Sequence, residues 1–515
     1  MPPSFAGQLG LFQARAITPA KTDLFTVLFG ANDLIPALSA PTTPGNPAGL
    51  DVAGAAAATT VASGVQSLVA LGARNVLVAG LPNLGSTPRT LASGATATAF
   101  GLRASTAFNQ ELKARLRPIA ATTADLNLTY IDVQGILDRV VLDFKQLGFA
   151  NASSFFLAPA AAGGGVGDPN SYVFWDDIHP SAKTHAILAG IVVEALNPEP
   201  VLGTAATQGT AALALAGLAQ SALDRRVAEL GVVAPRAAGR ADLYASFNYG
   251  DGDRAADGWR RKFAYTAQVV TAGTDYVLSD GFVIGAAVDH GRLDAKLAAG
   301  AGRFRTDSQV GRVYGLWQNG PVSLVVDADY GAVTINDIRR TTAFAGFPTR
   351  GKSGGSQWGA GLKAAWSTQL NGAALRPWLG LRTQRVSLDA YAESDVPGVR
   401  MAFDAQEANR SAGSVGVDLG TATRFAERPL RLDFRAAWHG ELTDKTRAVS
   451  GRLADNFTRT TTINVADGDG SGFELGAAAT LALGKKWSTS LGYTGDIRAD
   501  DKLASRLFLS VQTGF

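Results

Sequence analysis

The second half of the chain, from about Ala241 to Phe515, alternates apolar with polar or small residues at a period of two. The segment from Leu430 to Trp438 is the clearest case, and segments 322–331 and 262–269 repeat the pattern. This period places successive side chains on opposite faces of a β-strand. Because a soluble β-sandwich alternates in the same way, the pattern alone predicts an all-β domain and leaves its surroundings open.

Three further features favour a membrane barrel over a sandwich. Seven of the eight tryptophans lie in this half, as expected for aromatic girdles: Trp259, Trp317, Trp358, Trp366, Trp378, Trp438 and Trp487. The connection 484–486 is very short whereas the stretch 336–354 is long, which is typical of periplasmic turns and outer loops. The chain also ends on a strand with outward residues suited to lipid: Leu507, Leu509, Val511, Thr513 and Phe515.

A closed transmembrane barrel of about twelve antiparallel strands accounts for all three features. Closure pairs every backbone donor and acceptor between strands, so that no open edge faces hydrocarbon. We expect lipid to meet only the apolar faces, including the set Phe263, Tyr265, Ala267 and Val269.

The first 200 residues read as an α/β domain. Segments 24–29, 75–79 and 128–131 are nearly continuous apolar runs of strand length, separated by helical stretches at about 52–71 and 96–116. Buried strands that alternate with helices predict a parallel sheet. In such sheets, functional residues gather beyond the carboxyl ends of the strands.

Composition excludes several classes of protein and site. At 515 residues, two domains are expected. A net charge of +3 without a basic stripe argues against nucleic-acid binding, and the absence of cysteine, with only four histidines, argues against a metal site. The most apolar run, 211–219, is too short for a membrane-spanning helix, and residues 1–8 do not resemble a secretion signal.

Two short motifs carry the chemistry. Gly30-Ala31-Asn32-Asp33 directly follows the first apolar strand, and Asp176-Asp177-Ile178-His179-Pro180 precedes an amphipathic helix at 181–196. Taken singly, the first reads as a turn with a helix cap, and the second as a helix start with proline in the first turn. Their order along one α/β domain is more specific than either motif alone.

The two motifs resemble the third and fifth sequence blocks of the GDSL, or SGNH, esterase family, with its flavodoxin-like parallel sheet. The resemblance covers about Ser4 to Leu196, and segments 81–88 and 108–112 are also similar to the family. It implies that Asn32 and Gly30 donate to an oxyanion, that His179 is the general base and that Asp176 orients its imidazole. It implies no metal and no cofactor.

The family's nucleophile block, a Gly-Asp-Ser triplet, has no counterpart in these residues, so none is assigned as nucleophile. Ser86 follows a glycine but not a Gly-Asp pair. We expect the natural protein to start upstream of Met1, and we expect this chain to hydrolyse p-nitrophenyl esters no faster than its His179→Ala variant. The strand 24–29 would then form an exposed apolar edge, which predicts a poorly stable N-terminal domain beside an intact barrel.

The segment from about Ala241 to Phe515 resembles the translocator barrel of autotransporters, the proteins of type V secretion. In that family a helix threads the lumen, and Thr204 to Leu230 is the candidate, although an interdomain linker helix would read the same. The resemblance implies that the barrel-assembly machinery reads a C-terminal aromatic, here Phe515, and that periplasmic chaperones assist. The expected domains are a partial hydrolase at 1–200, a linker and luminal helix at 201–235 and the barrel at 236–515.

The leading functional hypothesis is an outer-membrane autotransporter that displays a carboxylester hydrolase outside the cell. Its partners would be an acyl ester or lipid substrate and outer-membrane lipid, with no nucleic acid, and we expect a monomer. The alternative is a non-catalytic surface or adhesin-type autotransporter. A plain pore is disfavoured because a luminal helix would plug it.

Overall fold

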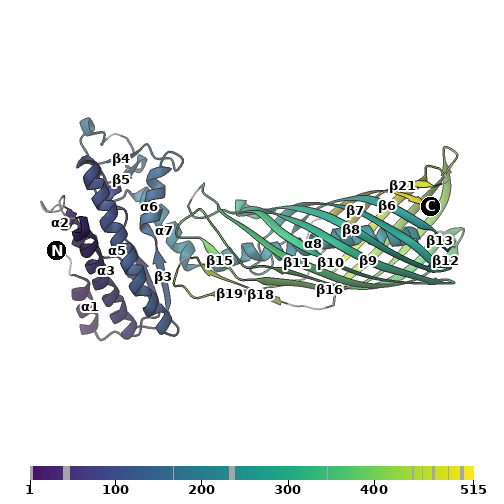
Figure 1. Ribbon diagram of the computed structural model, residues 1–515, viewed down its shortest axis with the longest axis horizontal. Coiled ribbons are helices and arrows are strands. Elements are labelled where there is room, and N and C mark those ends of the chain that lie inside the picture. The colour runs from purple at the N-terminus through teal and green to yellow at the C-terminus, as the bar shows by residue number, and fades with distance from the viewer. Residues whose placement is uncertain are drawn as a thin grey trace.

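The computed structural model describes residues 4–38, 47–165, 167–230, 238–344, 346–442, 446–454, 456–466, 470–484, 486–498 and 504–514. An α/β domain stands at one end of a long β-barrel, and a single helix runs from that domain into the barrel lumen (Figure 1). Both expected domain types are therefore present. The last residue, Phe515, and with it the expected C-terminal aromatic signal, lies outside the described residues.

The N-terminal domain has the expected parallel sheet. Its main elements are α1 (Phe5–Ala14), β1 (Leu24–Val27), α2 (Ala31–Leu38), α3 (Pro47–Ala70), β2 (Asn75–Ala79), η2 (Leu84–Ser86), α4 (Pro88–Ala92), α5 (Ala95–Thr122), β3 (Asn127–Ile131), α6 (Val133–Leu142), β4 (Asn151–Phe155), β5 (Tyr172–Phe174) and α7 (Ala182–Leu196). The three apolar runs form β1, β2 and β3, paired in that order and in parallel, while β4 pairs with β5 in a separate parallel pair.

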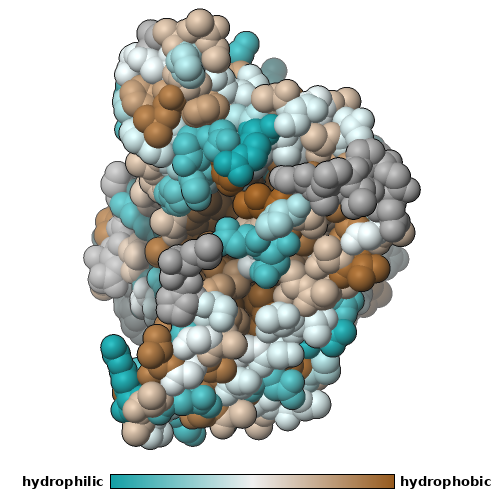
Figure 2. Space-filling view, turned by 90° about the vertical axis from the view of Figure 1, so that its left-hand side faces the viewer, coloured by the Kyte–Doolittle hydropathy of each residue, from teal (hydrophilic) through white to brown (hydrophobic). Residues whose placement is uncertain are grey.

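Within the described part of the domain, β1 is an edge strand, as the sequence predicted. Leu24 is 47% exposed and Leu28 is 64% exposed, and Leu11 and Ile17 add further exposed apolar surface to this domain. Figure 2 views the molecule from the N-terminal end and shows apolar surface among hydrophilic patches. Aromatic contacts from α1 cover part of the strand, because Phe12 meets Phe25 edge-on.

Twelve antiparallel strands close the barrel, in agreement with the prediction. They are β6 (Ala241–Arg254), β7 (Phe263–Ser279), β8 (Phe282–Leu297), β9 (Gly302–Asn319), β10 (Val322–Arg340), β11 (Thr349–Trp366) continued by β12 (Thr368–Leu370), β13 (Ala373–Leu388), β16 (Gln406–Phe425), β17 (Arg428–Glu441), β20 (Gly472–Ala482), β21 (Trp487–Arg498) and β22 (Ala504–Gly514). The first strand pairs with the last, β6 with β22, and β11 pairs with β13, so the ring has no open edge.

The connections differ at the two ends of the barrel, as predicted. Turns far from the N-terminal domain are short, such as 280–281 and 320–321. Connections near that domain are longer, and they include an outer sheet built from β14 (Tyr391–Ala392), β15 (Met401–Phe403), β18 (Thr446–Leu453) and β19 (Thr461–Ala466). The expected long loop 336–354 is shorter than predicted and spans 341–348, because strand pairing continues to Arg340 and resumes at Thr349.

The expected luminal helix is α8 (Glu199–Leu230), which starts five residues before the predicted Thr204 and lies inside the barrel, so the alternative of a simple linker is wrong. Its Arg226 donates to Asp275 of the wall at 2.7 Å, and both side chains are buried. By length and composition α3 and α8 could each cross a membrane, contrary to the prediction. Both are alanine-rich helices that pack within the protein, α3 against α5 and α8 against the barrel wall.

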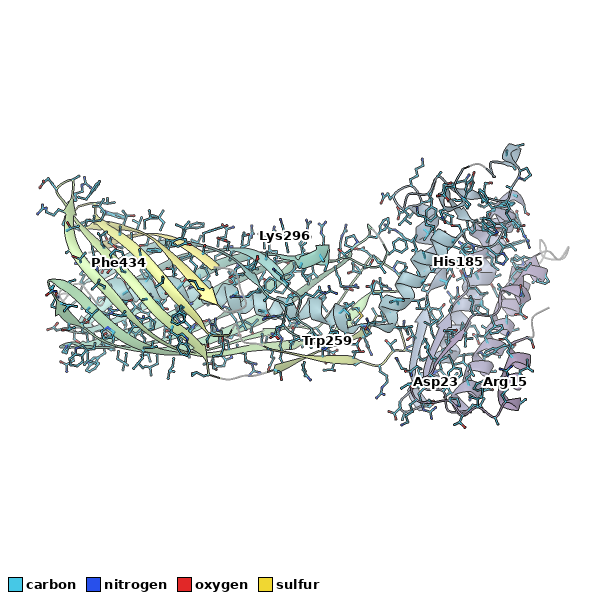
Figure 3. The ribbon with its side chains drawn as sticks, turned by 180° about the vertical axis from the view of Figure 1, so that it is seen from behind. Arg15, Asp23, His185, Trp259, Lys296 and Phe434 are labelled. Carbon is cyan, nitrogen blue, oxygen red and sulfur yellow. The ribbon has the colours of Figure 1, made fainter. Side chains whose placement is uncertain are left out.

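The outer face of the barrel carries two belts. Apolar side chains form the belt far from the N-terminal domain, as on β8 and β9: Phe282, Ile284, Val288, Val313 and Trp317. Charged and polar side chains form the belt beside that domain: His290, Arg292, Asp294, Lys296, Arg303, Arg305 and Asp307. Cross-strand ion pairs join Arg292 to Asp307 at 3.0 Å and Arg305 to Asp294 at 2.9 Å. In Figure 3, Lys296 lies near the N-terminal domain and Phe434 near the opposite end.

The expectation that all apolar faces meet lipid is therefore wrong for the strand ends beside the N-terminal domain. There Phe263, Ala267 and Val269 point inward and pack on α8, because the outer surface at this height is polar. Trp378 is also inward, at 6% exposed, and Trp259 lies in the 255–262 turn near the N-terminal domain. The other five tryptophans of this half are exposed on the strands. Leu507, Leu509 and Val511 face outward as predicted, whereas Thr513 is buried opposite Trp487.

The two belts predict where the bilayer ends. Lys296 lies eight positions beyond Val288 on β8. At about 3.3 Å per residue and a strand tilt of about 40°, it lies roughly 20 Å further along the barrel axis, toward the N-terminal domain. Because the protein has no cysteine, single substitutions can be labelled without background. In lipid vesicles a charged maleimide should label Lys296→Cys rapidly and leave Val288→Cys unlabelled. Equal labelling of both would place the bilayer elsewhere.

Candidate active site

The motif residues 176–179 form a tight turn after β5. The Asp176 Oδ1 atom accepts the backbone N–H groups of Ile178, at 2.9 Å, and His179, at 2.6 Å. The Nδ1 atom of His179 lies 2.7 Å from Asp176 Oδ2. The backbone N–H of Trp175 donates to the His179 carbonyl at 2.8 Å and closes the turn. The spacing of three residues thus brings the carboxylate and imidazole together locally.

This geometry suits a general base. A carboxylate on Nδ1 holds the proton on that nitrogen and leaves Nε2 as the acceptor. The His179 side chain is 72% exposed, and within the described residues nothing hydrogen-bonds to Nε2. Burial acts to raise the pKa of Asp176, but the hydrogen bonds from His179 and Ile178 outweigh it, so the pKa lies below its ordinary value.

The lowered pKa of Asp176 predicts how the turn responds to acid. A carboxylate whose pKa is lowered by folding stabilises the folded form above its unfolded pKa, and this contribution is lost as the pH falls through the folded pKa. We therefore expect the Ile178 and His179 amides to keep their protection from hydrogen exchange at pH 4, and to lose it only in more acidic buffer. Asp176→Asn should weaken protection already at neutral pH. Protection equal to wild type in that variant would contradict the assignment.

Gly30 and Asn32 lie at the carboxyl end of β1, at the start of α2. Asn32 is exposed in the first turn of the helix. Gly30 has a φ of +114°, and a Cβ atom there would come within 2.4 Å of the Phe108 ring, so the position requires glycine for steric reasons. No hydrogen bond among the described residues joins Asn32 to the Asp176–His179 pair. The roles of Asn32 and Gly30 at an oxyanion therefore stay predictions.

Arg89 lies beside this site, and no sequence motif pointed to it. Arg89, on α4, donates to both carboxylate oxygens of Asp177, at 2.8 and 3.0 Å, and its backbone N–H donates to the Asp177 carbonyl. The side-chain hydrogen bonds to Asp177 raise the pKa of Arg89. Together with the backbone bond, they tie the 176–179 turn to α4, which follows β2. A single arginine in a short helix carries no local sequence signal for a partner 88 positions away.

Segments 81–88 and 108–112, which were also similar to the esterase family, contact each other in the structure. Asn109 on α5 accepts the N–H of Leu81 at 2.8 Å and donates to its carbonyl at 2.9 Å. Asn83 donates to Asp138 at 2.8 Å; burial of Asp138 raises the pKa of this carboxyl and the bond from Asn83 opposes the shift. These contacts fix the segment 81–83, which leads into α4 and its Arg89. Among the described residues no three His, Asp or Glu side chains gather as a metal site.

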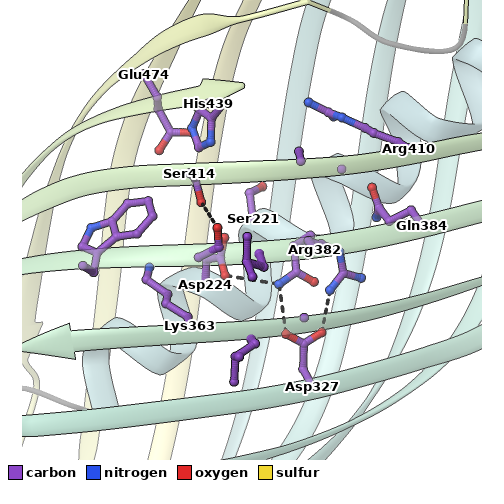
Figure 4. A pocket seen from close by; sticks show the side chains of 18 of the residues that line it. Ser221, Asp224, Asp327, Lys363, Arg382, Gln384, Arg410, Ser414, His439 and Glu474 are labelled. Carbon is purple, nitrogen blue, oxygen red and sulfur yellow. Dashed lines mark hydrogen bonds and ion pairs between the residues drawn. The ribbon is translucent and has the colours of Figure 1, made fainter. Parts of the chain in front are cut away.

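A second cluster of polar residues lies between α8 and the barrel wall (Figure 4). Its labelled side chains include Asp224 of the helix and Asp327, Lys363, Arg382 and His439 of the wall. Arg382 pairs with Asp327 at 2.6 Å and so joins two strands of the wall, while Gln220 of α8 donates to Asp327 at 3.5 Å. The cluster includes residues of both the helix and the wall, and neither Asp176 nor His179 lines it.

Comparisons with known proteins match both domains. Residues 7–192 match the family model of the GDSL-like lipase/acylhydrolases, and residues 243–494 match that of the autotransporter β-domain. The GDSL esterase/lipase EXL2 of Arabidopsis thaliana is 31% identical over 186 residues, which cover 33% of this chain and 48% of that protein. Lipase 1 of Photorhabdus luminescens is 23% identical over 321 residues, which cover 59% of this chain and 46% of the relative.

The chain spans about half the length of these two relatives. Among solved structures, the translocator domain of the autotransporter NalP from Neisseria meningitidis aligns with a TM-score of 0.47 at 16% identity, covering 59% of this chain and 98% of that one.

Proposed function

The chain is an outer-membrane autotransporter with a GDSL-type hydrolase domain ahead of its barrel, and we propose that it displays this domain outside the cell to hydrolyse carboxylic esters. The observation that carries the proposal is the Asp176–His179 pair, in which a hydrogen-bonded carboxylate orients an exposed imidazole. Acyl esters and lipids are the proposed substrate class. The proposed domains are 1–200, 201–235 and 236–515, although α8 begins just before the first of these boundaries.

In the proposed reaction, Nε2 of His179 takes the proton of a serine hydroxyl as its oxygen attacks the ester carbonyl. The Asn32 side-chain amide and the Gly30 backbone N–H would donate to the oxyanion that forms. His179 would then return the proton to the leaving alcohol, and water would release the acyl group by the same steps. Asp176 stabilises the imidazolium throughout. No serine of the 515 residues is assigned as the nucleophile, which by family resemblance belongs to a Gly-Asp-Ser block.

We further propose that the protein is a monomer and that the barrel-assembly machinery inserts it with the help of periplasmic chaperones. The closed single-chain barrel supports a monomer, because one chain completes the ring. The tightly paired luminal helix argues against a pore function.

The test is to isolate the protein from outer membranes of its source cells, map its N-terminal peptide by mass spectrometry and assay p-nitrophenyl esters. A Gly-Asp-Ser triplet upstream of Met1, together with turnover that His179→Ala abolishes, is the expected result. A start at Met1 without His179-dependent turnover would overturn the enzyme proposal and favour a non-catalytic surface protein.

A further inference from the structure

The N-terminal domain and the outer end of the barrel share one hydrophobic core. From the domain, this core includes Ile131, Ile136, Phe174 and Ile191; from the barrel connections, it includes Phe344, Val396, Val399 and Met401. The outer sheet adds Val449 and Ile463, and α8 adds Leu202. All these side chains are at most 3% exposed. Removing the barrel would therefore expose core residues of the N-terminal domain to water.

A buried charge cluster crosses the same boundary. Arg340, at the end of β10, is only 4% exposed and pairs with Glu393 at 2.7 Å and with Glu194 of α7. The other oxygen of Glu194 accepts the backbone N–H of Ala343 at 2.6 Å. Separating α7 from the barrel would leave the buried Arg340 guanidinium with one carboxylate fewer, so the pair favours this position of α7.

The third contact across this boundary is made at the edge of the parallel sheet. The Tyr130 backbone N–H on β3 donates to Asn456 Oδ1 at 2.9 Å, and Asn456 Nδ2 donates to the Tyr130 carbonyl at 2.8 Å. Phe457 packs against the domain core, and Arg459 lies 3.4 Å from Asp125. We call Asn456, Phe457 and Arg459 the edge clamp.

An asparagine side chain carries an N–H donor group and a carbonyl acceptor, as the backbone does. Asn456 therefore satisfies the outward N–H and C=O of Tyr130 as a further strand would, and it comes from the connection between β18 and β19 of the outer sheet. The opposite edge, β1, has no such partner strand among the described residues. Asn456 thus caps the β3 edge of the sheet, whereas no strand among the described residues pairs with the β1 edge.

We propose that the outer barrel connections, through the edge clamp and the Glu194–Arg340 pair, complete the fold of the N-terminal domain and fix its orientation on the barrel. The barrel then covers the open edge of that domain's sheet as well as anchoring the domain. This role is independent of whether the domain hydrolyses esters.

Hydrogen exchange of the full chain in detergent micelles, read residue by residue with mass spectrometry, tests the proposal. Asn456→Ala removes both bonds to Tyr130, and the Tyr130 amide should exchange at least about tenfold faster than in wild type. Amides of the central strand β2 should keep their protection. Asn464→Ala is the matched control, because Asn464 lies exposed on β19 of the same outer sheet.

Asn456→Asp provides a second variant, since it keeps an acceptor for the Tyr130 N–H and loses the donor to its carbonyl. We expect an exchange rate between those of wild type and Asn456→Ala. Unchanged Tyr130 exchange in Asn456→Ala, or an equal effect of Asn464→Ala, would overturn the proposal. A circular-dichroism spectrum with intact β-structure confirms that each variant retains its barrel.

Discussion

For the proposed enzyme, with a Gly-Asp-Ser block ahead of Met1, His179→Ala is expected to lower kcat for p-nitrophenyl esters by a factor of about 10⁶. The loss is large because the members of a catalytic triad act as a unit, and without a base the serine hydroxyl is a weak nucleophile. Initial rates with short-chain and long-chain esters give the measurement.

His185→Ala is the matched control for this prediction. His185 lies on α7 six residues further along, and its Nδ1 is 3.1 Å from the Ser181 carbonyl. Its replacement should leave turnover within about twofold, since it does not contact the Asp176–His179 pair among the described residues. In the 515-residue chain, the unmodified protein and its His179→Ala variant should have the same rate. Turnover of this chain that depends on His179 would mean that one of its own serines is the nucleophile.

Replacing Arg312 by methionine should destabilise the barrel by about 3–5 kcal/mol. Arg312 points into the lumen from β9 with 2% of its side chain exposed, and it pairs with Asp289 at 3.3 Å and Asp329 at 3.4 Å. It also donates to Gln220 on α8. Its removal leaves the buried carboxylates with one cation fewer and breaks the hydrogen bond to Gln220 of α8. The midpoint of urea unfolding in lipid vesicles, followed by the loss of β-structure, measures the effect.

Arg292→Met tests whether burial causes that cost. Arg292 is 44% exposed on β8 and pairs with Asp307 on the outer wall at 3.0 Å. An exposed ion pair contributes at most about 1 kcal/mol, so this variant should unfold close to wild type. Equal shifts in both variants would show that the luminal pairs do not stabilise the barrel.

Local features of the sequence predicted much of this structure. The period-two alternation predicted the twelve barrel strands, because backbone geometry alone fixes that side-chain period. Apolar runs separated by helices predicted β1, β2 and β3 in a parallel sheet. The family resemblance of the 176–180 motif predicted the contact of Asp176 with His179, which a separation of three residues allows to form within one turn.

Contacts between distant segments could not be predicted in this way. Arg89 and Asp177 are 88 positions apart, and Tyr130 and Asn456 are 326 apart. Neither contact is predicted by any periodic pattern or short motif in a single sequence. The inward position of Trp378 has the same origin, because that side chain lies in the lumen beside Lys363 and Arg435.

The local sequence sets which residues share a face of each strand, whereas the folded chain sets which of the two faces is buried. Beside the N-terminal domain, Phe263 and Val269 turn inward onto α8, whereas at the level of the apolar belt Val288 and Val313 turn outward. The alternation is the same in both regions. The difference arises because an apolar side chain is stable wherever it is kept out of water. Only the folded chain places a helix in the lumen, and only the folded chain determines which part of the outer wall contacts lipid and which part contacts water.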